Sequence, residues 1–147
     1  MKRTVVLLCI ITILTIPAVA DTGLGVVFGY PGSVGITIKL NNFPVISATW
    51  AFGDTTSIGA TCDYWVVNQA LSGTLLHWYL GIGAFGHFVV NAGKGEDSIG
   101  LGLRLPIGLQ IFPVKQLEVY IELVPSLPLL PGIGFDINSA VGIRYHF

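Results

Sequence analysis

Apolar and polar residues alternate along most of the chain after its first twenty residues, and the tail from Ile133 to Phe147 shows the pattern most clearly. One phase contains Ile133, Phe135, Ile137, Val141, Ile143, Tyr145 and Phe147, with Ser139 as its single polar member. The other phase contains Gly134, Asp136, Asn138, Ala140, Gly142, Arg144 and His146. Because successive strand side chains point to opposite faces, the tail predicts a strand with one apolar and one polar face.

The same alternation divides residues 21–147 into eight segments separated by turn signals such as Pro31-Gly32-Ser33 and the charged loop from Asn91 to Asp97. The predicted strands are Thr22–Tyr30, Val34–Leu40, Val45–Phe52, Thr56–Val67, Thr74–Val90, Ser98–Phe112, Leu117–Val124 and Ile133–Phe147. A polar break is expected from Asn68 to Gly73, and pairing beyond Val124 is expected to be partial because prolines cannot donate to a ladder. An apolar band edged by aromatics around a polar interior predicts an all-β fold, an eight-stranded antiparallel up-and-down transmembrane β-barrel.

The charged residues test this assignment, because the phases follow from the apolar residues alone. Every charge inside a predicted strand falls in the polar phase, namely Lys39, Asp63, Arg104, Glu118, Glu122, Asp136 and Arg144. A soluble barrel would show the opposite arrangement, whereas Arg or Lys facing lipid near the midplane costs ~2–4 kcal/mol. We therefore predict that these seven side chains form a charge network that fills the lumen, with Glu118 opposite Arg144 if the last two strands form a near-tight hairpin.

Composition supports a membrane protein without helical spans. The chain is 52% hydrophobic and 10% charged, with a mean hydropathy of +0.76. After the first twenty residues, no uninterrupted apolar run reaches the ~18 residues of a helical span. A closed barrel is the other structure that satisfies every backbone group in lipid.

The first twenty residues have the pattern of a secretory signal peptide. Lys2 and Arg3 precede an apolar stretch from Thr4 to Ile16, and Ala18-Val19-Ala20 matches the small-residue cleavage pattern. We predict Sec export and cleavage after Ala20, which leaves residues 21–147 as the barrel domain. The segment holds two of the seven Lys and Arg residues and none of the eight Asp and Glu residues, so the remainder has a net charge of about −3. This charge gives no basis for nucleic-acid binding.

Candidate chemistry is sparse. Cys62 falls in an apolar phase and is interpreted as a small hydrophobic residue. The stretch from Gly81 to Gly86 matches G-x-G-x-x-G but is followed by more strand, so its glycines are interpreted as inward spacers. His77 and His87 are ten residues apart on one predicted strand, ~33 Å, and cannot share a metal ion. We predict no catalytic residue, cofactor or metal site.

The chain resembles the small eight-stranded outer-membrane barrels of the OmpA and OmpX type, and is most similar to an uncharacterised bacterial barrel family. The resemblance rests on five segments: Gly23-Leu24-Gly25, Phe52-Gly53-Asp54, Pro106 to Leu109, Leu117 to Glu122, and Ala140 to Phe147. It implies insertion in the outer membrane, with Tyr145 and Phe147 in a C-terminal signal that the barrel-assembly machinery reads. It implies no established activity.

Three functions remain open at this point. We favour a structural or surface-interaction barrel, whose partners would be outer-membrane lipid, the assembly machinery and an extracellular ligand or host protein. A narrow channel is the alternative. A lipid-modifying enzyme is the third, although the His and Ser pair two residues apart that is found in outer-membrane lipid A deacylases is missing at His77 and His87, which are followed at that spacing by Tyr79 and Val89.

Overall fold

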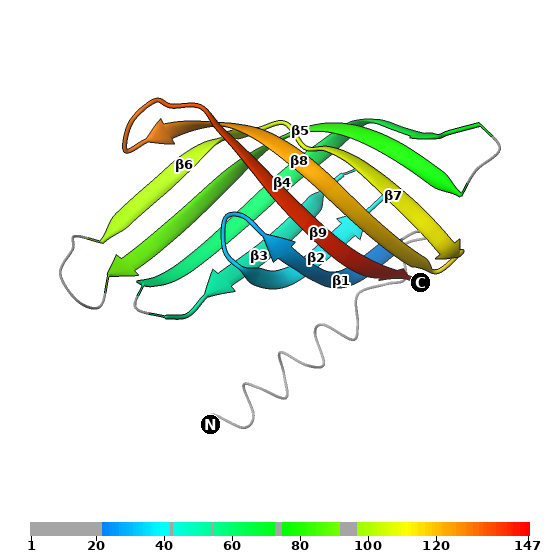
Figure 1. Ribbon diagram of the computed structural model, residues 1–147, viewed down its shortest axis with the longest axis horizontal. Helices are drawn as coiled ribbons and strands as arrows, with labels where there is room; N and C mark the ends of the chain where they lie inside the picture. Colours follow the sequence, from blue (N-terminus) through cyan, green and yellow to red (C-terminus); the bar gives the residue numbers. More distant parts are fainter. Residues whose placement is uncertain (1–21, 42, 54, 73–74, 92–96) are drawn as a thin grey trace, which may run out of the picture.

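The chain forms a twisted antiparallel barrel in which each strand runs opposite to its neighbours (Figure 1). The computed structural model describes residues 22–41, 43–53, 55–72, 75–91 and 97–147. The predicted signal peptide and its cleavage site, parts of four predicted connections between strands, and the first residue of the strand predicted from Thr74 lie outside these residues. Within them, no helix is long and apolar enough to cross a bilayer.

Nine strands make up the described part of the sheet. They are β1 (Thr22–Gly29), β2 (Val34–Leu40), β3 (Val45–Ala51), β4 (Thr55–Ala70), β5 (Leu76–Asn91), β6 (Ser98–Arg104), β7 (Ile107–Val114), β8 (Leu117–Leu130) and β9 (Asp136–His146).

The sheet closes on itself with eight positions rather than nine. β6 and β7 lie end to end, because each pairs with β5 on one side and with β8 on the other. The ring is completed by β1 against β9 and by β4 against β5. The predicted all-β, eight-position, up-and-down architecture is therefore confirmed.

The sixth predicted strand was wrong in one respect, since it is interrupted at Leu105 and Pro106. Proline has no N–H for the ladder, so the regular pairing stops there. The carbonyl groups of prolines near the interruption still accept backbone hydrogen bonds. Gly81 donates its N–H to the carbonyl of Pro106 at 2.8 Å, and Leu105 donates to the carbonyl of Pro125 at 2.9 Å. The barrel wall thus remains closed across the break.

Other strand ends also differ from the predictions. β8 itself continues to Leu130, but it pairs with β9 only as far as Ser126 and with β6 through a register shift, so pairing beyond Val124 is partial as predicted. The tail strand begins at Asp136 rather than Ile133. β4 continues through the expected polar break to Ala70, with a register shift between Trp65 and Val67. A bulge adds one residue to one strand and so changes which side chains face inward, which the regular alternation did not predict.

The strands have very unequal lengths. β1, β2 and β3 have 8, 7 and 7 residues, whereas β4 and β5 have 16 each. Along the barrel axis, the wall is therefore short where β1 to β3 lie and long where β4 and β5 lie (Figure 1).

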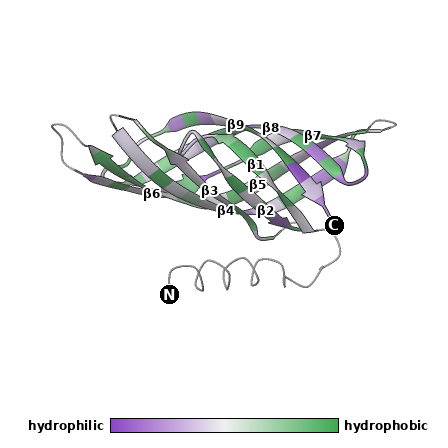
Figure 2. Ribbon diagram, turned by 90° about the horizontal axis from the view of Figure 1, so that it is seen from below, coloured by the Kyte–Doolittle hydropathy of each residue, from purple (hydrophilic) through white to green (hydrophobic). Residues whose placement is uncertain are grey.

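The barrel exposes apolar side chains and buries polar ones. Exposed residues include Ile58, Ile99, Leu123 and Ile143, whereas the buried set includes six charged side chains. Apolar and polar residues alternate along the strands in Figure 2. A water-soluble fold has the reverse arrangement, so the exterior has the character expected of a surface in contact with hydrocarbon.

Candidate functional site

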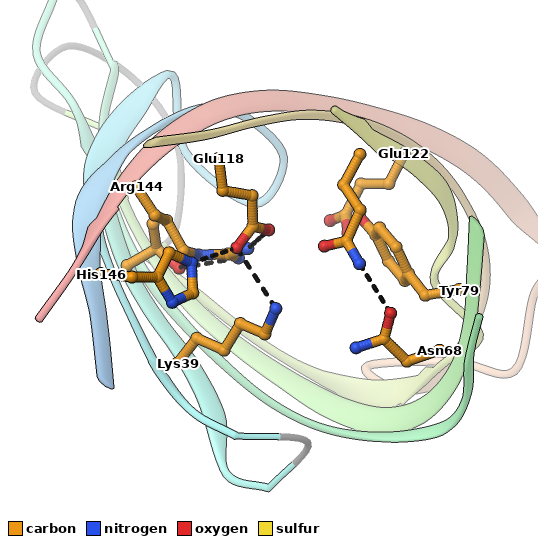
Figure 3. Close-up of polar contacts among 9 residues, drawn as sticks. Lys39, Asn68, Tyr79, Glu118, Glu122, Arg144 and His146 are labelled. Carbon is orange, nitrogen blue, oxygen red and sulfur yellow. Dashed lines mark hydrogen bonds and ion pairs between the residues drawn. The ribbon is translucent and has the colours of Figure 1, made fainter. Parts of the chain in front are cut away.

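The charged side chains of the lumen form two groups, and the first is centred on Glu118. Its carboxylate is fully buried, with Oε1 2.6 Å from Nη1 of Arg144. Its second oxygen, Oε2, lies 3.2 Å from Nζ of Lys39 and 2.6 Å from Nε2 of His146. Arg144 and His146 come from the neighbouring strand β9, and Lys39 reaches the carboxylate from β2 (Figure 3). One carboxylate thus binds three nitrogen-bearing side chains.

Other groups complete the environment of the two cations. Arg144 donates from Nε and Nη2 to Oγ1 of Thr37, each at 3.1 Å, and its guanidinium lies 3.9 Å from the centre of the Tyr120 ring. The ammonium of Lys39 lies 4.3 Å from the centre of the Trp65 ring. Cation–π contacts strengthen when the pair is desolvated, so these aromatic rings help to offset the cost of burying positive charge.

The second group is centred on Glu122, four residues further along β8. Arg104 donates from Nη2 to one oxygen at 2.8 Å, and the hydroxyl of Tyr79 donates to the other at 2.8 Å. Arg104 Nε also lies 3.1 Å from Oδ1 of Asp63. Both of these atoms lack a hydrogen bond of good geometry, so we regard this contact as an ion pair held by charge rather than by alignment.

A stack of two aromatic rings connects the groups. Tyr79, which belongs to the Glu122 group, packs face to face on Trp65 with 3.9 Å between ring centres. Trp65 in turn lies under Lys39, which belongs to the Glu118 group. Both rings are almost completely buried, so contacts between side chains run continuously along the lumen.

Glycines on neighbouring strands provide the space for these bulky groups. Gly142 lies directly across from Tyr120, and Gly108 directly across from Tyr79. A Cβ atom at either glycine would collide with the tyrosine ring. The same relation holds between Gly83 and the carboxylate of Asp63. The inward glycines therefore act as spacers for specific large partners.

Six of the seven residues predicted for the lumen network come together in these groups, but Asp136 does not. It is exposed at the first position of β9, and it lies closer to that end of the barrel than either group does. The alternation places it in the correct phase, but phase alone does not say how far a residue lies along the barrel axis. Its exclusion leaves three carboxylates facing Lys39, Arg104 and Arg144, so these six charges are formally balanced.

His146 was missed as a member of the network. It is buried and shares the polar phase with Arg144, two residues earlier on β9. Its position opposite Gly23 of β1 directs it into the lumen, and the phase pattern of the tail could have identified it. Another missed contact is the hydrogen bond from Gln110 to Asn68 at 2.6 Å, which follows the register shift in β4 (Figure 3).

Tyr145 and Phe147 lie where the sequence predicted, on the outward phase at the end of the chain. Both side chains are exposed, and their ring centres are 5.2 Å apart. Among the described residues, no group of three or more His, Cys, Asp and Glu side chains could hold a metal ion. The chemistry concentrated in the barrel is therefore that of a buried electrostatic network.

A family described as "Protein of unknown function (DUF3996)" matches residues 13–147. The chain belongs to this family. No curated protein sequence gives a significant match.

Two solved structures are similar to the barrel. Neisserial surface protein A (NspA) is 14% identical, with 86% of this chain and 96% of that chain covered and a TM-score of 0.50. Ail, the attachment invasion locus protein of Yersinia pestis, is 13% identical, with 86% and 97% covered and a TM-score of 0.37. At such low identity, the likeness to NspA concerns the fold alone.

Proposed function

We propose that this chain is an integral outer-membrane protein with a structural or surface-interaction role and a lumen closed by its own side chains. The observation that carries this proposal is the division of side chains between the two faces of one wall. Apolar groups cover the outside, while Glu118, Glu122 and their cationic partners are buried inside. An apolar outer surface is stable in contact with a bilayer. A barrel with eight strand positions has an interior just wide enough for such side chains to fill.

Export and insertion form part of the same proposal. The first twenty residues would direct the chain across the inner membrane, and the barrel-assembly machinery would then recognise the end of β9. Lipid and this machinery are thus the proposed partners during assembly. A surface ligand or host protein would have to bind the loops between β1 and β2, β3 and β4, β5 and β6, or β8 and β9. The similar fold of NspA belongs to a surface protein of Neisseria, which is compatible with such a role.

We propose that the barrel is not an enzyme. Each histidine packs against an aromatic ring: His77 on Phe112, His87 on Phe85, and His146 on Phe112. His146 also has its carboxylate partner in Glu118. The hydroxyl of Tyr30 lies 3.3 Å from Nδ1 of His87. We interpret all of these contacts as structural.

A narrow channel is the second candidate, and one observation favours it. Several buried polar atoms in the lumen have no hydrogen-bond partner among the residues that the structure describes, including Nε1 of Trp65, Oγ1 of Thr49 and Oε1 of Gln110. Buried polar atoms of this kind are commonly satisfied by water. A connected file of such waters would provide a path for small solutes.

Conductance of the refolded protein in a planar bilayer distinguishes the two candidates. The closed barrel predicts no stable open-channel steps from the wild type. Glu118→Ala, which removes the carboxylate shared by three partners, should instead produce brief openings. Steady ohmic conductance from the wild type would overturn the closed lumen and establish the channel.

A further inference from the structure

The break between β6 and β7 leaves a crevice of about 350 Å³ on the outside of the barrel. At this point the backbone of Leu105 and Pro106 leaves the regular ladder, opposite Pro125 of β8. Leu105 lies across from Pro125, whereas Pro106 is buried and does not line the crevice. The crevice therefore lies on the outer side of the interruption, between apolar side chains of β5, β6 and β8.

A residue from the β8–β9 connection forms one side of the crevice. Phe135 precedes β9, and Gly134 beside it donates a hydrogen bond to the carbonyl of Pro128 at 3.1 Å. This bond holds the connection close to β8 while Phe135 stays 67% exposed. The apolar side chains that line the crevice are Ile82, Leu103, Leu105, Pro125, Leu127 and Phe135.

The two polar residues at the crevice direct their hydrogen-bonding groups elsewhere. Arg104 is bound to Glu122 in the lumen, and the hydroxyl of Ser126 donates to the carbonyl of Val124 at 3.1 Å. A polar ligand would therefore lose its hydration and gain no partner, which is costly. A hydrocarbon chain would instead gain dispersion contacts with the apolar side chains that line the crevice.

We propose that this crevice binds one acyl chain of a lipid from the outer leaflet of the surrounding membrane. The proposal rests on the proposed function, because the crevice is continuous with the apolar exterior that the bilayer would cover. The outer leaflet follows from the topology, since the β8–β9 connection lies at the end of the barrel opposite Phe147 (Figure 1). The bound chain would hold the connection against the wall.

Photo-crosslinking tests the proposal in vesicles of phosphatidylcholine that contain a small fraction of lipid with a diazirine on its acyl chain. Cross-linked peptides are mapped by mass spectrometry and compared with those of two variants. Leu103→Trp fills the crevice, and Leu109→Trp adds the same bulk to an outward position of β7 outside it. Leu109 is a matched control position, because its side chain is 44% exposed and that of Leu103 is 48% exposed. Heat-modifiable migration on gels shows that each variant is folded.

We expect cross-links at the crevice residues to exceed those at other outward positions several times over in the wild type and in Leu109→Trp. Leu103→Trp should reduce the crevice signal to the level of its surroundings. Uniform labelling of the whole exterior, or equal crevice signals in the two variants, would overturn the acyl-chain site while supporting the lipid-facing wall. If folded protein showed no lipid cross-links at any outward position, the proposed membrane location itself would fail.

Discussion

Arg144 lies directly across from Glu118 on the neighbouring strand, and its Nη1 is 2.6 Å from Oε1 of that carboxylate. The pair is buried, and Lys39 and His146 approach the other oxygen of the same carboxylate. Arginine suits this position because its planar fork can donate to the carboxylate and to Thr37 at once. The pair therefore fixes β8 and β9 in register from inside the lumen.

Arg144→Ala should lower the free energy of unfolding by ~3–5 kcal/mol, because it leaves Glu118 less compensated in a desolvated site. Urea unfolding followed by tryptophan fluorescence in detergent measures the change. Lys115→Ala is the control, since Lys115 is exposed in the turn between β7 and β8. Equal unfolding midpoints for Arg144→Ala and the wild type would contradict a structural role for the network.

Tyr79→Phe should lower the free energy of unfolding by ~1.5–3 kcal/mol, because it removes a hydrogen bond to a charged acceptor. The lost donor is the hydroxyl that lies 2.8 Å from Oε2 of Glu122, and the ring and its stacking on Trp65 are kept. Tyr145→Phe makes the same chemical change at an exposed position and should have little effect. The same urea experiment compares the two variants, and equal losses would argue against the Glu122 group.

Gly108→Val should destabilise the barrel by ~1–3 kcal/mol through overpacking, because the new side chain would occupy the place of the Tyr79 ring. Gly134→Val is the matched control, since a Cβ at Gly134 meets no other atom within 4 Å. Thermal loss of heat-modifiable migration on gels measures both. A Gly108→Val barrel as stable as the Gly134→Val barrel would show that the lumen has room to spare.

The sequence predicted the barrel well because alternation and charge position report on the same two faces. The phase of Glu118 and Arg144, together with a hairpin about Pro131, even predicted that they lie opposite each other, and the register confirms it. Other features depend on information that alternation does not contain. Asp136 has the correct phase but lies too far along the barrel axis, and Asn68 turns inward only after the register shift that follows Trp65.

The proline positions show a second limit of the sequence argument. Pairing beyond Val124 was expected to be partial, and on the β9 side it ends at Ser126. The β8 strand nevertheless continues to Leu130, and the complete interruption lies at Pro106 of the neighbouring segment, where none was expected. Proline lacks a donor but keeps its carbonyl group. Whether a strand tolerates it depends on which neighbour would have accepted the missing N–H, and that is a property of the assembled sheet.

Deletion of Phe147 should reduce insertion of the barrel in cells, because we propose that the end of β9 serves as the assembly signal. Refolding of the purified variant into detergent should stay close to wild type, since Phe147 is exposed and contributes little packing. Phe43→Ala changes another exposed aromatic, in the turn between β2 and β3, and should leave insertion unchanged. Unchanged insertion after the deletion would refute the signal.

The mature protein should begin at Asp21 and should fractionate with the outer membrane. N-terminal sequencing of protein recovered from the membrane fraction measures the first point, and immunoblotting of the separated fractions measures the second. Ala20→Lys, which removes the small residue at the proposed cleavage site, should slow processing. Recovery from the soluble periplasm, or with the first twenty residues attached, would contradict the proposal.

The unequal strand lengths have a consequence for the membrane itself. With a rise of ~3.3 Å per residue and a tilt of ~40°, the 7-residue strands β2 and β3 rise about 18 Å, whereas the 16-residue β4 and β5 rise about 40 Å. A hydrocarbon core of ~30 Å is thicker than the short side, so lipids would shorten beside β1 to β3 or the barrel would lean. The longer β4 and β5 can extend into the headgroup region, because a whole bilayer is ~40–45 Å thick. The bilayer around such a protein would be thinner beside the short strands than beside the long ones. Neighbouring membrane proteins would therefore prefer one side of the barrel over the other.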